Sequence, residues 1–322
     1  MSGKREEMLE EKVVVENERA ADETEVASTE VVSQEPPAPF KMSTNLTVLA
    51  ELGVEMPEHP LDLSHVFAEE GITHTFMIAT MGRTGSTWLA DAIGQIPAFN
   101  HPDEYFSQVR YFGDFSAPQS FENHFRTVVR RYSRNGCFGF KINPRRLSWL
   151  SEAIDIEATF PATGCAWIGM KRLNIVKQAF SYARARNSGH WHNFVGRSTA
   201  PDEIEAVAEE FVWGNLISIL EEEKLFEDLV SSNNLKPMRI VYEEVHDSKD
   251  QLMIRLASHI REDVDIRPDI ASMKYNIEKL KSTGLDEEAS FTNRYSRLIN
   301  RIMSERDTIS PEYVKSQVAY AF

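Results

Sequence analysis

The chain has 322 residues, of which 42% are apolar, and it carries 35 basic against 50 acidic side chains, for a formal net charge of −15. This length and apolar content allow one large or two small folded domains and exclude a wholly disordered chain. The acidic balance excludes general binding to nucleic acid or to anionic membranes, because both need a basic surface.

The first 45 residues differ from the rest in composition. Residues 1–40 hold eleven acidic and four basic side chains, and the proline-rich stretch 34–39 follows the last of the charged clusters. Such a segment buries too little apolar surface to offset the loss of chain entropy. We therefore expect a disordered acidic leader over 1–45, an N-terminal extension over 46–72 and a folded domain over 73–322.

The segments that would direct the chain to a membrane or a secretory route are not visible. The sequence shows no signal-peptide pattern and no run of about 18 apolar residues, so we expect a cytoplasmic protein. The two cysteines, Cys137 and Cys165, are too few for a disulfide scaffold or a four-ligand zinc site. They are expected to be buried thiols.

Short apolar runs and helical patterns alternate through the rest of the chain. The first run, 75–80, is followed by a loop of small residues and by a helical pattern over 88–96. Further strands are predicted at 138–142, 165–170 and 238–242, and helices at 175–183, 203–227 and 252–260. This alternation predicts an α/β protein, with a P-loop-like three-layer fold in which a central parallel sheet is flanked by helices.

The loop after the first strand, residues 81–87, is rich in glycine and in hydroxyl side chains. A turn of this kind between a strand and a helix presents backbone N–H groups at the positive end of the helix dipole, where phosphate-like anions bind. Gly82 and Gly85 let the backbone approach the anion, while Arg83 adds a fixed positive charge. The loop therefore predicts an anion site.

This loop departs from the nucleotide-triphosphate motif G-x-x-x-x-G-K-[ST]. Ser86 stands where that motif has its lysine, and Arg83 is the cation instead. The third strand leads into Lys171 and Arg172 rather than into an acid that could hold Mg²⁺. A Mg-triphosphate is accordingly not the expected ligand.

Residues 82–89 resemble the 5′-phosphosulfate loop of sulfotransferases that use 3′-phosphoadenosine 5′-phosphosulfate (PAPS). The chain is similar to the bacterial trehalose 2-sulfotransferase branch over roughly residues 74–298. The matching motifs are Glu104-Tyr105-Phe106 after the first helix, Gly139-Phe140-Lys141 in the second strand, Arg172 to Ser181 after the third strand, and the segment 286–295.

The resemblance implies PAPS as co-substrate, no metal, a homodimer, and a sulfotransferase domain over residues 73–322. It implies that the 5′-phosphosulfate is bound by Arg83, Thr84, Gly85, Ser86, Thr87 and Trp88. It implies that the 3′-phosphate is bound by Arg172 and Ser181. Arg294, with other cations near the C-terminus, is expected to close over that phosphate.

Sulfuryl transfer also needs a base that accepts the proton of the acceptor. Glu104 is the first candidate, because it follows the first helix at the carboxyl edge of the sheet, where such folds bind ligands. His101 is the rival, and His190 and His192 are a third option. The residues expected to line the acceptor pocket are Tyr105, Phe106, Lys141, His190 and His192.

These observations predict an enzyme that moves a sulfuryl group from PAPS to a hydroxyl, or an amine, of a small polar acceptor. A carbohydrate or related metabolite is the first choice of acceptor. Two alternatives stay open: a P-loop kinase or nucleotide hydrolase, and a catalytically inactive nucleotide-binding scaffold.

Overall fold

The computed structural model describes residues 49–50, 53–106, 119–188, 207–274 and 285–319. The chain divides into two units, Met1–Met42 and Ser43–Phe322, and the first of these lies outside the described residues. The leader expected over 1–45 therefore stays a prediction.

A four-stranded parallel sheet forms the centre of the described part of the second unit. Its strands are β2 (His74–Thr80), β4 (Cys137–Ile142), β5 (Cys165–Lys171) and β6 (Met238–Val241), in the spatial order β4-β2-β5-β6. Met77 of β2 lies opposite Phe140 of β4 and Trp167 of β5. Because all four strands are parallel, their carboxyl ends meet at one edge. The next strand in the chain, β4, lies on one side of β2, and the one after it, β5, lies on the other. Sheets of this kind bind ligands at the carboxyl edge beside such a switch in strand order.

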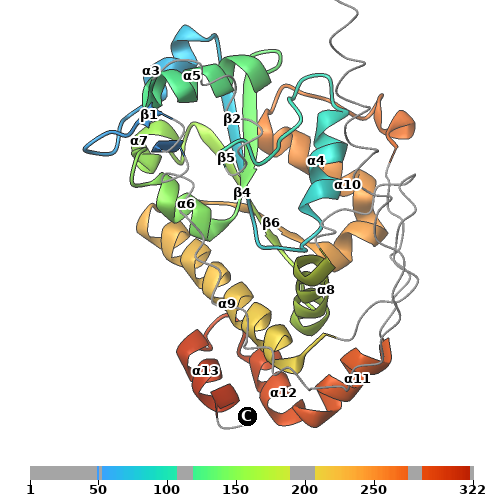
Figure 1. Cartoon of the computed structure of the whole chain (residues 1–322). Helices are drawn as coiled ribbons and strands as arrows, with labels where there is room; N and C mark the ends of the chain where they lie inside the picture. Colours follow the sequence, from blue (N-terminus) through green and yellow to red (C-terminus); the bar gives the residue numbers. More distant parts are fainter. Residues whose placement is uncertain (1–48, 51–52, 107–118, 189–206, 275–284, 320–322) are drawn as a thin grey trace, which may run out of the picture. The chain divides into compact units, whose positions relative to one another are not determined.

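Helices cover both faces of this sheet, as the apolar strands require (Figure 1). Met77 of β2 faces one core and Phe76 faces the other, because successive side chains of a strand point to opposite sides. The first face is covered by α3 (Ser64–Glu69), α5 (Phe121–Tyr132), α6 (Pro144–Leu150) and α7 (Ile156–Thr159). The second face is covered by α4 (Ser86–Gly94) and α10 (Tyr242–Ile260). The predicted α/β class with a helix-flanked parallel sheet is confirmed.

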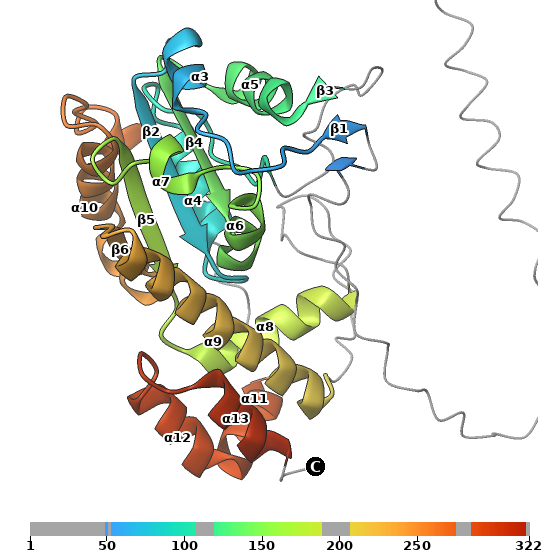
Figure 2. The same cartoon turned by 90° about the vertical axis from the view of Figure 1, so that its left-hand side faces the viewer.

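Five further helices pack around a core of their own (Figure 2). They are α8 (Ile175–Ser188), α9 (Glu209–Ser232), α11 (Leu285–Arg294), α12 (Ser296–Ser304) and α13 (Pro311–Ala319). Trp213 of α9 and Phe291 of α11 lie at the centre of this core, with ring centroids 5.1 Å apart. The C-terminal helices are thereby packed against α8, which follows β5, and α9, which precedes β6.

The expected N-terminal extension shares a core with the sheet where it is described. Val66 and Phe67 of α3 are buried among the side chains of the first face. β1 (Val54–Glu55) pairs in parallel with β3 (Gln119–Ser120) to form a second, two-stranded sheet. The short 3₁₀ helix η2 (Ile270–Ser272) follows α10.

Several element boundaries differ from the expectation. The strand expected over 238–242 ends at Val241, because Tyr242 opens α10 and two acids follow it in the first turn, where the helix dipole favours negative charge. The helix expected over 252–260 therefore begins ten residues earlier, with a kink at Ser248. The helix expected over 203–227 extends to Ser232. Cys137 and Cys165 are buried thiols, as expected, and burial raises the pKa of each to about 12.

Candidate functional site

The loop between β2 and α4 has a backbone suited to anion binding. Gly85 is the N-cap residue of α4 with φ of 86°, and Arg83 has φ of 67°. A non-glycine residue with positive φ is uncommon and often marks a functional site. Bends of this type directly before a helix form concave groups of backbone N–H donors. The loop therefore has the bend expected before the helix, and its binding of an anion stays a prediction.

Two tyrosine rings pack against the glycines of the loop. A Cβ atom added to Gly82 would lie 2.7 Å from the ring of Tyr182 in α8. At Gly85 it would lie 2.6 Å from the ring of Tyr242, the first residue of α10. Only glycine fits at these positions unless a ring moves, so elements distant in sequence hold the loop from two sides.

The side chain of Thr84 braces the loop from inside. It is fully buried, and its Oγ1 donates to the carbonyl of Met81 at 3.0 Å and lies 2.7 Å from Oγ1 of Thr80. The Thr84 hydroxyl is therefore engaged within the protein and holds the loop in place. Ser86, Thr87 and Trp88 lie in the first turn of α4, at the positive end of its helix dipole.

The structure brings Arg83, Arg172 and Ser181 together. Arg83 Nε donates to Ser181 Oγ at 2.9 Å, and Arg172 Nη1 donates to the carbonyl oxygen of Arg83 at 3.4 Å. The guanidinium of Arg172 also lies 4.9 Å from the ring centre of Tyr242. In the same cluster, Gln178 Nε2 donates to the carbonyl of Gly82 at 2.8 Å. Three residues expected to bind the two phosphate ends of PAPS are thus neighbours.

The charges of this group favour an anion. Burial lowers the pKa of the Arg83 guanidinium, and the neighbouring charge of Arg172 lowers it further. Burial likewise lowers the pKa of Arg172, while Tyr242 and Glu243 act in the opposite direction. Two desolvated cations next to each other repel, and a phosphate or sulfate between them relieves that repulsion.

A second charged cluster lies at the carboxyl end of β4. Lys141 Nζ is 3.5 Å from Asp103 Oδ1 and 4.0 Å from Glu104 Oε1. Arg146 of α6 approaches the other oxygen of Glu104, with Nη1 3.4 Å from Oε2. Lys141 itself is only 5% exposed. The candidate base is therefore held between a buried lysine and an arginine.

Tyr105 and Phe106 anchor this segment in the core. Each residue is 4% exposed. Tyr105 stacks on Tyr132 with ring centroids 4.3 Å apart, and Phe106 stacks on Phe125 at 5.5 Å. Their expected contact with an acceptor stays a prediction. Their packing explains how the adjoining Glu104 is fixed at the sheet edge.

His101, the rival base, lies against α4. Its Nε2 is 3.0 Å from Asp91 Oδ1, and both side chains are about half exposed. Its ring also closes on Gly94, where an added Cβ would lie 2.7 Å from it. These contacts orient His101 toward the helix that follows the loop.

Other expected site residues are placed elsewhere or not described. Arg294 of α11 pairs with Glu209 of α9 at 2.7 Å and is 60% exposed. Its expected contact with the 3′-phosphate stays a prediction. His190 and His192 lie outside the described residues, so their expected roles also stay predictions.

Sequence reasoning missed the tyrosines that flank the loop. Tyr182 lies one residue after Ser181, and Tyr242 ends the fourth apolar run. Neither position has a pattern that points to the loop, since their contacts depend on how α8 and α10 pack. Sequence reasoning also missed Arg146, which pairs with Glu104. A basic residue a few positions after a strand does not by itself indicate a functional site.

Within the described ranges, no group of three or more His, Cys, Asp or Glu side chains is arranged to hold a metal ion. None of the described helices combines the length and the apolar character needed to cross a membrane.

Comparison with known proteins adds one match. The sequence matches the family model described as Stf0 sulphotransferase over residues 75–297, which is more than half of the chain. This range contains the loop, Glu104, Lys141 and both arginines of the cluster. A search of curated proteins finds no match.

Proposed function

The chain belongs to the Stf0 sulfotransferase family, the family that its motifs resemble, and from this premise we propose that it transfers a sulfuryl group from PAPS to a small polar acceptor. The acceptor group is a hydroxyl or an amine, with a carbohydrate as the first choice. The observation that carries this proposal is the convergence of Arg83, Arg172 and Ser181 on one loop.

The donor end of the reaction is assigned to the loop and its two arginines. When bound, PAPS supplies an activated sulfuryl group whose departure leaves negative charge on the phosphate oxygen. Arg83 and the N–H groups of residues 84–88 stabilise this charge, because fixed donors in a desolvated site act without reorganisation. Arg172 and Ser181 bind the 3′-phosphate through charge-assisted hydrogen bonds.

The acceptor end is assigned to Glu104. Its carboxylate accepts the proton of the acceptor group while the sulfur–oxygen bond forms. Lys141 and Arg146 orient the two oxygens of this carboxylate. The contact between His101 and Asp91 supports Glu104 as the base over His101, since it directs the ring toward α4.

Thermal unfolding of the full chain with 3′-phosphoadenosine 5′-phosphate (PAP) or with Mg-ADP tests the donor assignment. We expect PAP to raise the melting temperature more than Mg-ADP, because only PAP carries the 3′-phosphate that is assigned to Arg172 and Ser181. A ligand at about 100 times its Kd stabilises the folded state by about 2.7 kcal/mol. Arg83→Ala should lose this shift. Arg131→Ala, which removes an exposed arginine of α5, should keep it.

Two outcomes contradict the assignment. One is a larger shift with Mg-ADP than with PAP, which would favour a kinase or hydrolase. The other is an Arg83→Ala variant that PAP still stabilises fully.

Transfer of labelled sulfate from PAPS to a panel of sugars tests the acceptor class. If Glu104 is the base, Glu104→Gln should lose this transfer while its PAP binding stays unchanged.

A further inference from the structure

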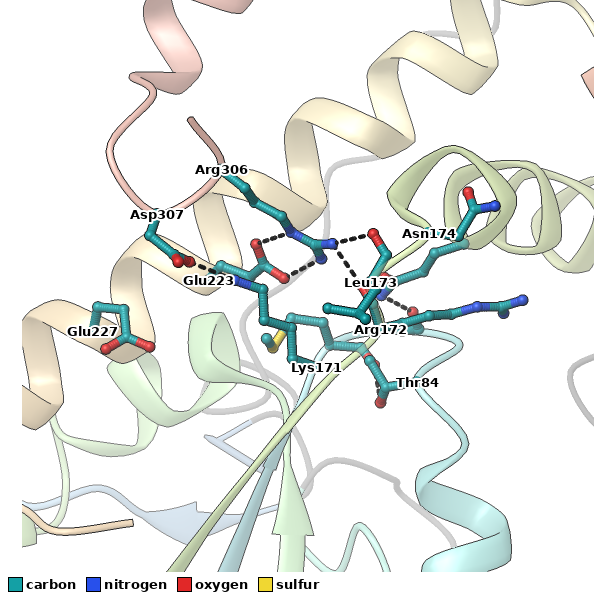
Figure 3. Close-up of polar contacts among 12 residues, drawn as sticks. Thr84, Lys171, Arg172, Leu173, Asn174, Glu223, Glu227, Arg306 and Asp307 are labelled. Carbon is teal, nitrogen blue, oxygen red and sulfur yellow. Dashed lines mark hydrogen bonds and ion pairs between the residues drawn. The ribbon is translucent and has the colours of Figure 1, made fainter. Parts of the chain in front are cut away.

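Arg306 makes a buried clamp on the backbone next to Arg172 (Figure 3). It lies between α12 and α13, and its guanidinium forms an ion pair with Glu223 of α9 in which the two side chains are 6% and 11% exposed. Nε donates to one carboxylate oxygen at 2.9 Å, and Nη2 donates to the other. Nη1 donates to two backbone carbonyls, those of Arg172 and of Leu173, the latter at 2.7 Å.

The same segment is held from its other side by α10. The backbone N–H groups of Leu173 and Asn174 donate to the carboxylate of Glu243, at 2.9 Å and 3.2 Å. Arg306 therefore binds the carbonyls of residues 172 and 173, and Glu243 binds the N–H groups of residues 173 and 174. Next to them, Lys171 pairs with Asp307 (Figure 3).

An arginine is the residue type that can make this clamp. Its planar fork binds a carboxylate with two donors and leaves further donors in a fixed direction, whereas a lysine ammonium is a single point charge. Burying such a pair is costly unless its hydrogen bonds are satisfied, and here Arg306 makes four. This arrangement does more than attach a C-terminal loop, because the carbonyls it binds belong to the strand end that carries Arg172.

We propose that Arg306 is a positioning residue for the 3′-phosphate site: it fixes the backbone of residues 172 and 173 so that the Arg172 guanidinium is held beside Arg83. This inference rests on the proposed function, which assigns the 3′-phosphate to Arg172. Arg306 lies beyond the family match at residues 75–297 and belongs to none of the motifs that the sequence shares with the family. Preorganised cations bind an anion more tightly, because less ordering is needed on binding.

Binding measurements with two nucleotides test this inference. PAP carries the 3′-phosphate, whereas adenosine 5′-monophosphate (AMP) lacks it, so the ratio of their dissociation constants reports on the 3′-phosphate site alone. We expect the unaltered chain to prefer PAP at least tenfold and Arg172→Ala to lose most of this preference. Arg306→Gln and Arg306→Lys should reduce the preference at least threefold, with AMP affinity changed less than twofold.

Arg301→Gln is the matched control. Arg301 is an arginine of the same C-terminal region, half exposed, and it pairs with Glu305 one turn further along the chain. Its removal should leave the preference for PAP unchanged. Arg306→Lys keeps a cation beside Glu223, so it still tests the positioning role if Arg306→Gln does not fold.

The outcomes separate the inference from the proposed function. If the Arg306 variants keep the full preference, or lose PAP and AMP affinity equally, the positioning role is wrong and the clamp is only structural. If Arg172→Ala loses the preference while Arg306→Lys keeps it, only the further inference fails. If the unaltered chain does not prefer PAP over AMP, both the assignment of the 3′-phosphate to Arg172 and the positioning role of Arg306 are wrong.

Discussion

At the scale of single residues, Gly85 shows why the loop sequence is so restricted. Its φ of 86° favours a residue without a side chain, and the ring of Tyr242 occupies the place of a Cβ atom. Gly71 has a similar torsion, with φ of 70°, but nothing lies within 4 Å of its Cβ position. The two glycines therefore separate the cost of the torsion from the cost of the ring contact.

We predict that Gly85→Ala removes PAP binding and lowers the free energy of unfolding by about 2–5 kcal/mol, the sum of a left-handed torsion and an overpacked contact. Gly71→Ala should cost about 1–2 kcal/mol for the torsion alone and keep PAP binding. Urea unfolding and calorimetric titration measure the two effects. Equal losses in both variants would show that the Tyr242 contact has no part in the loop.

The residues of the loop were partly predictable. The glycines and Arg83 indicate an anion site by themselves, and the resemblance to sulfotransferases connects them with Arg172 and Ser181. The braced side chain of Thr84 was not predictable, because its partners, Met81 and Thr80, become neighbours only when the loop turns back on β2.

At the scale of elements, the segment before Glu104 covers the free edge of β4. Asn100 is 2% exposed, and its amide donates to the carbonyl of Gly139 and accepts from its N–H, both at 2.7 Å. The carbonyl of Asp103 accepts from the N–H of Lys141 at 3.1 Å. A side-chain amide thus replaces a neighbouring strand at an edge that would otherwise lack partners. This pairing carries Glu104 to the carboxyl end of the sheet.

Asn100→Ala should lower the free energy of unfolding by about 2–4 kcal/mol, because it leaves two buried backbone groups of Gly139 without partners. Turnover should fall as well, since Glu104 follows this segment. Asn123→Ala, on the exposed side of α5, should change stability by less than about 0.5 kcal/mol. Denaturant unfolding of both variants measures the difference. An Asn100→Ala variant as stable as the control would mean that the pairing contributes nothing.

The elements themselves were predictable within a few residues. The strands at 75–80, 138–142 and 165–170 match β2, β4 and β5 closely, because buried parallel strands are nearly continuous apolar runs. The junction of β6 and α10 was misjudged, since Tyr242 has a side chain that is common in strands. Its place at the start of α10 depends on the packing of that helix against the sheet rather than on its own propensity.

At the scale of the whole molecule, the buried carboxyl of Glu222 makes stability depend on pH. It lies in α9 and is 4% exposed, and burial raises its pKa to about 7, while Asn143, Arg145 and Arg146 act in the opposite direction. The folded chain therefore holds this proton more tightly than the unfolded chain, in which the pKa is about 4.5. The contribution of this group to stability is fully present below pH 4.5 and is lost as the pH rises through about 7.

We predict that Glu222→Gln is more stable than the unaltered chain at pH 8 by about 3 kcal/mol, since a neutral amide avoids the cost of burying a charge. The difference should shrink as the pH falls through about 7 and approach zero below about 4.5, where Glu222 becomes largely neutral in both states. Urea unfolding at pH 5 and pH 8 measures it, with Glu210→Gln on the exposed side of the same helix as control. A gain that is equal at both pH values would contradict the burial argument.

The class of fold, the glycine-rich loop between strand and helix, and the family all follow from the amino-acid sequence alone, because strand and helix periods, glycine torsions and motif spacing act over short stretches of chain. The groups that support the loop from a distance are known only from the packing of the folded chain. Tyr182 and Tyr242 close on its glycines, and Arg306 reaches the carbonyl of Arg172 across 134 positions in the chain. Such contacts depend on strand order and helix packing, which bring together residues whose local sequences carry no sign of each other.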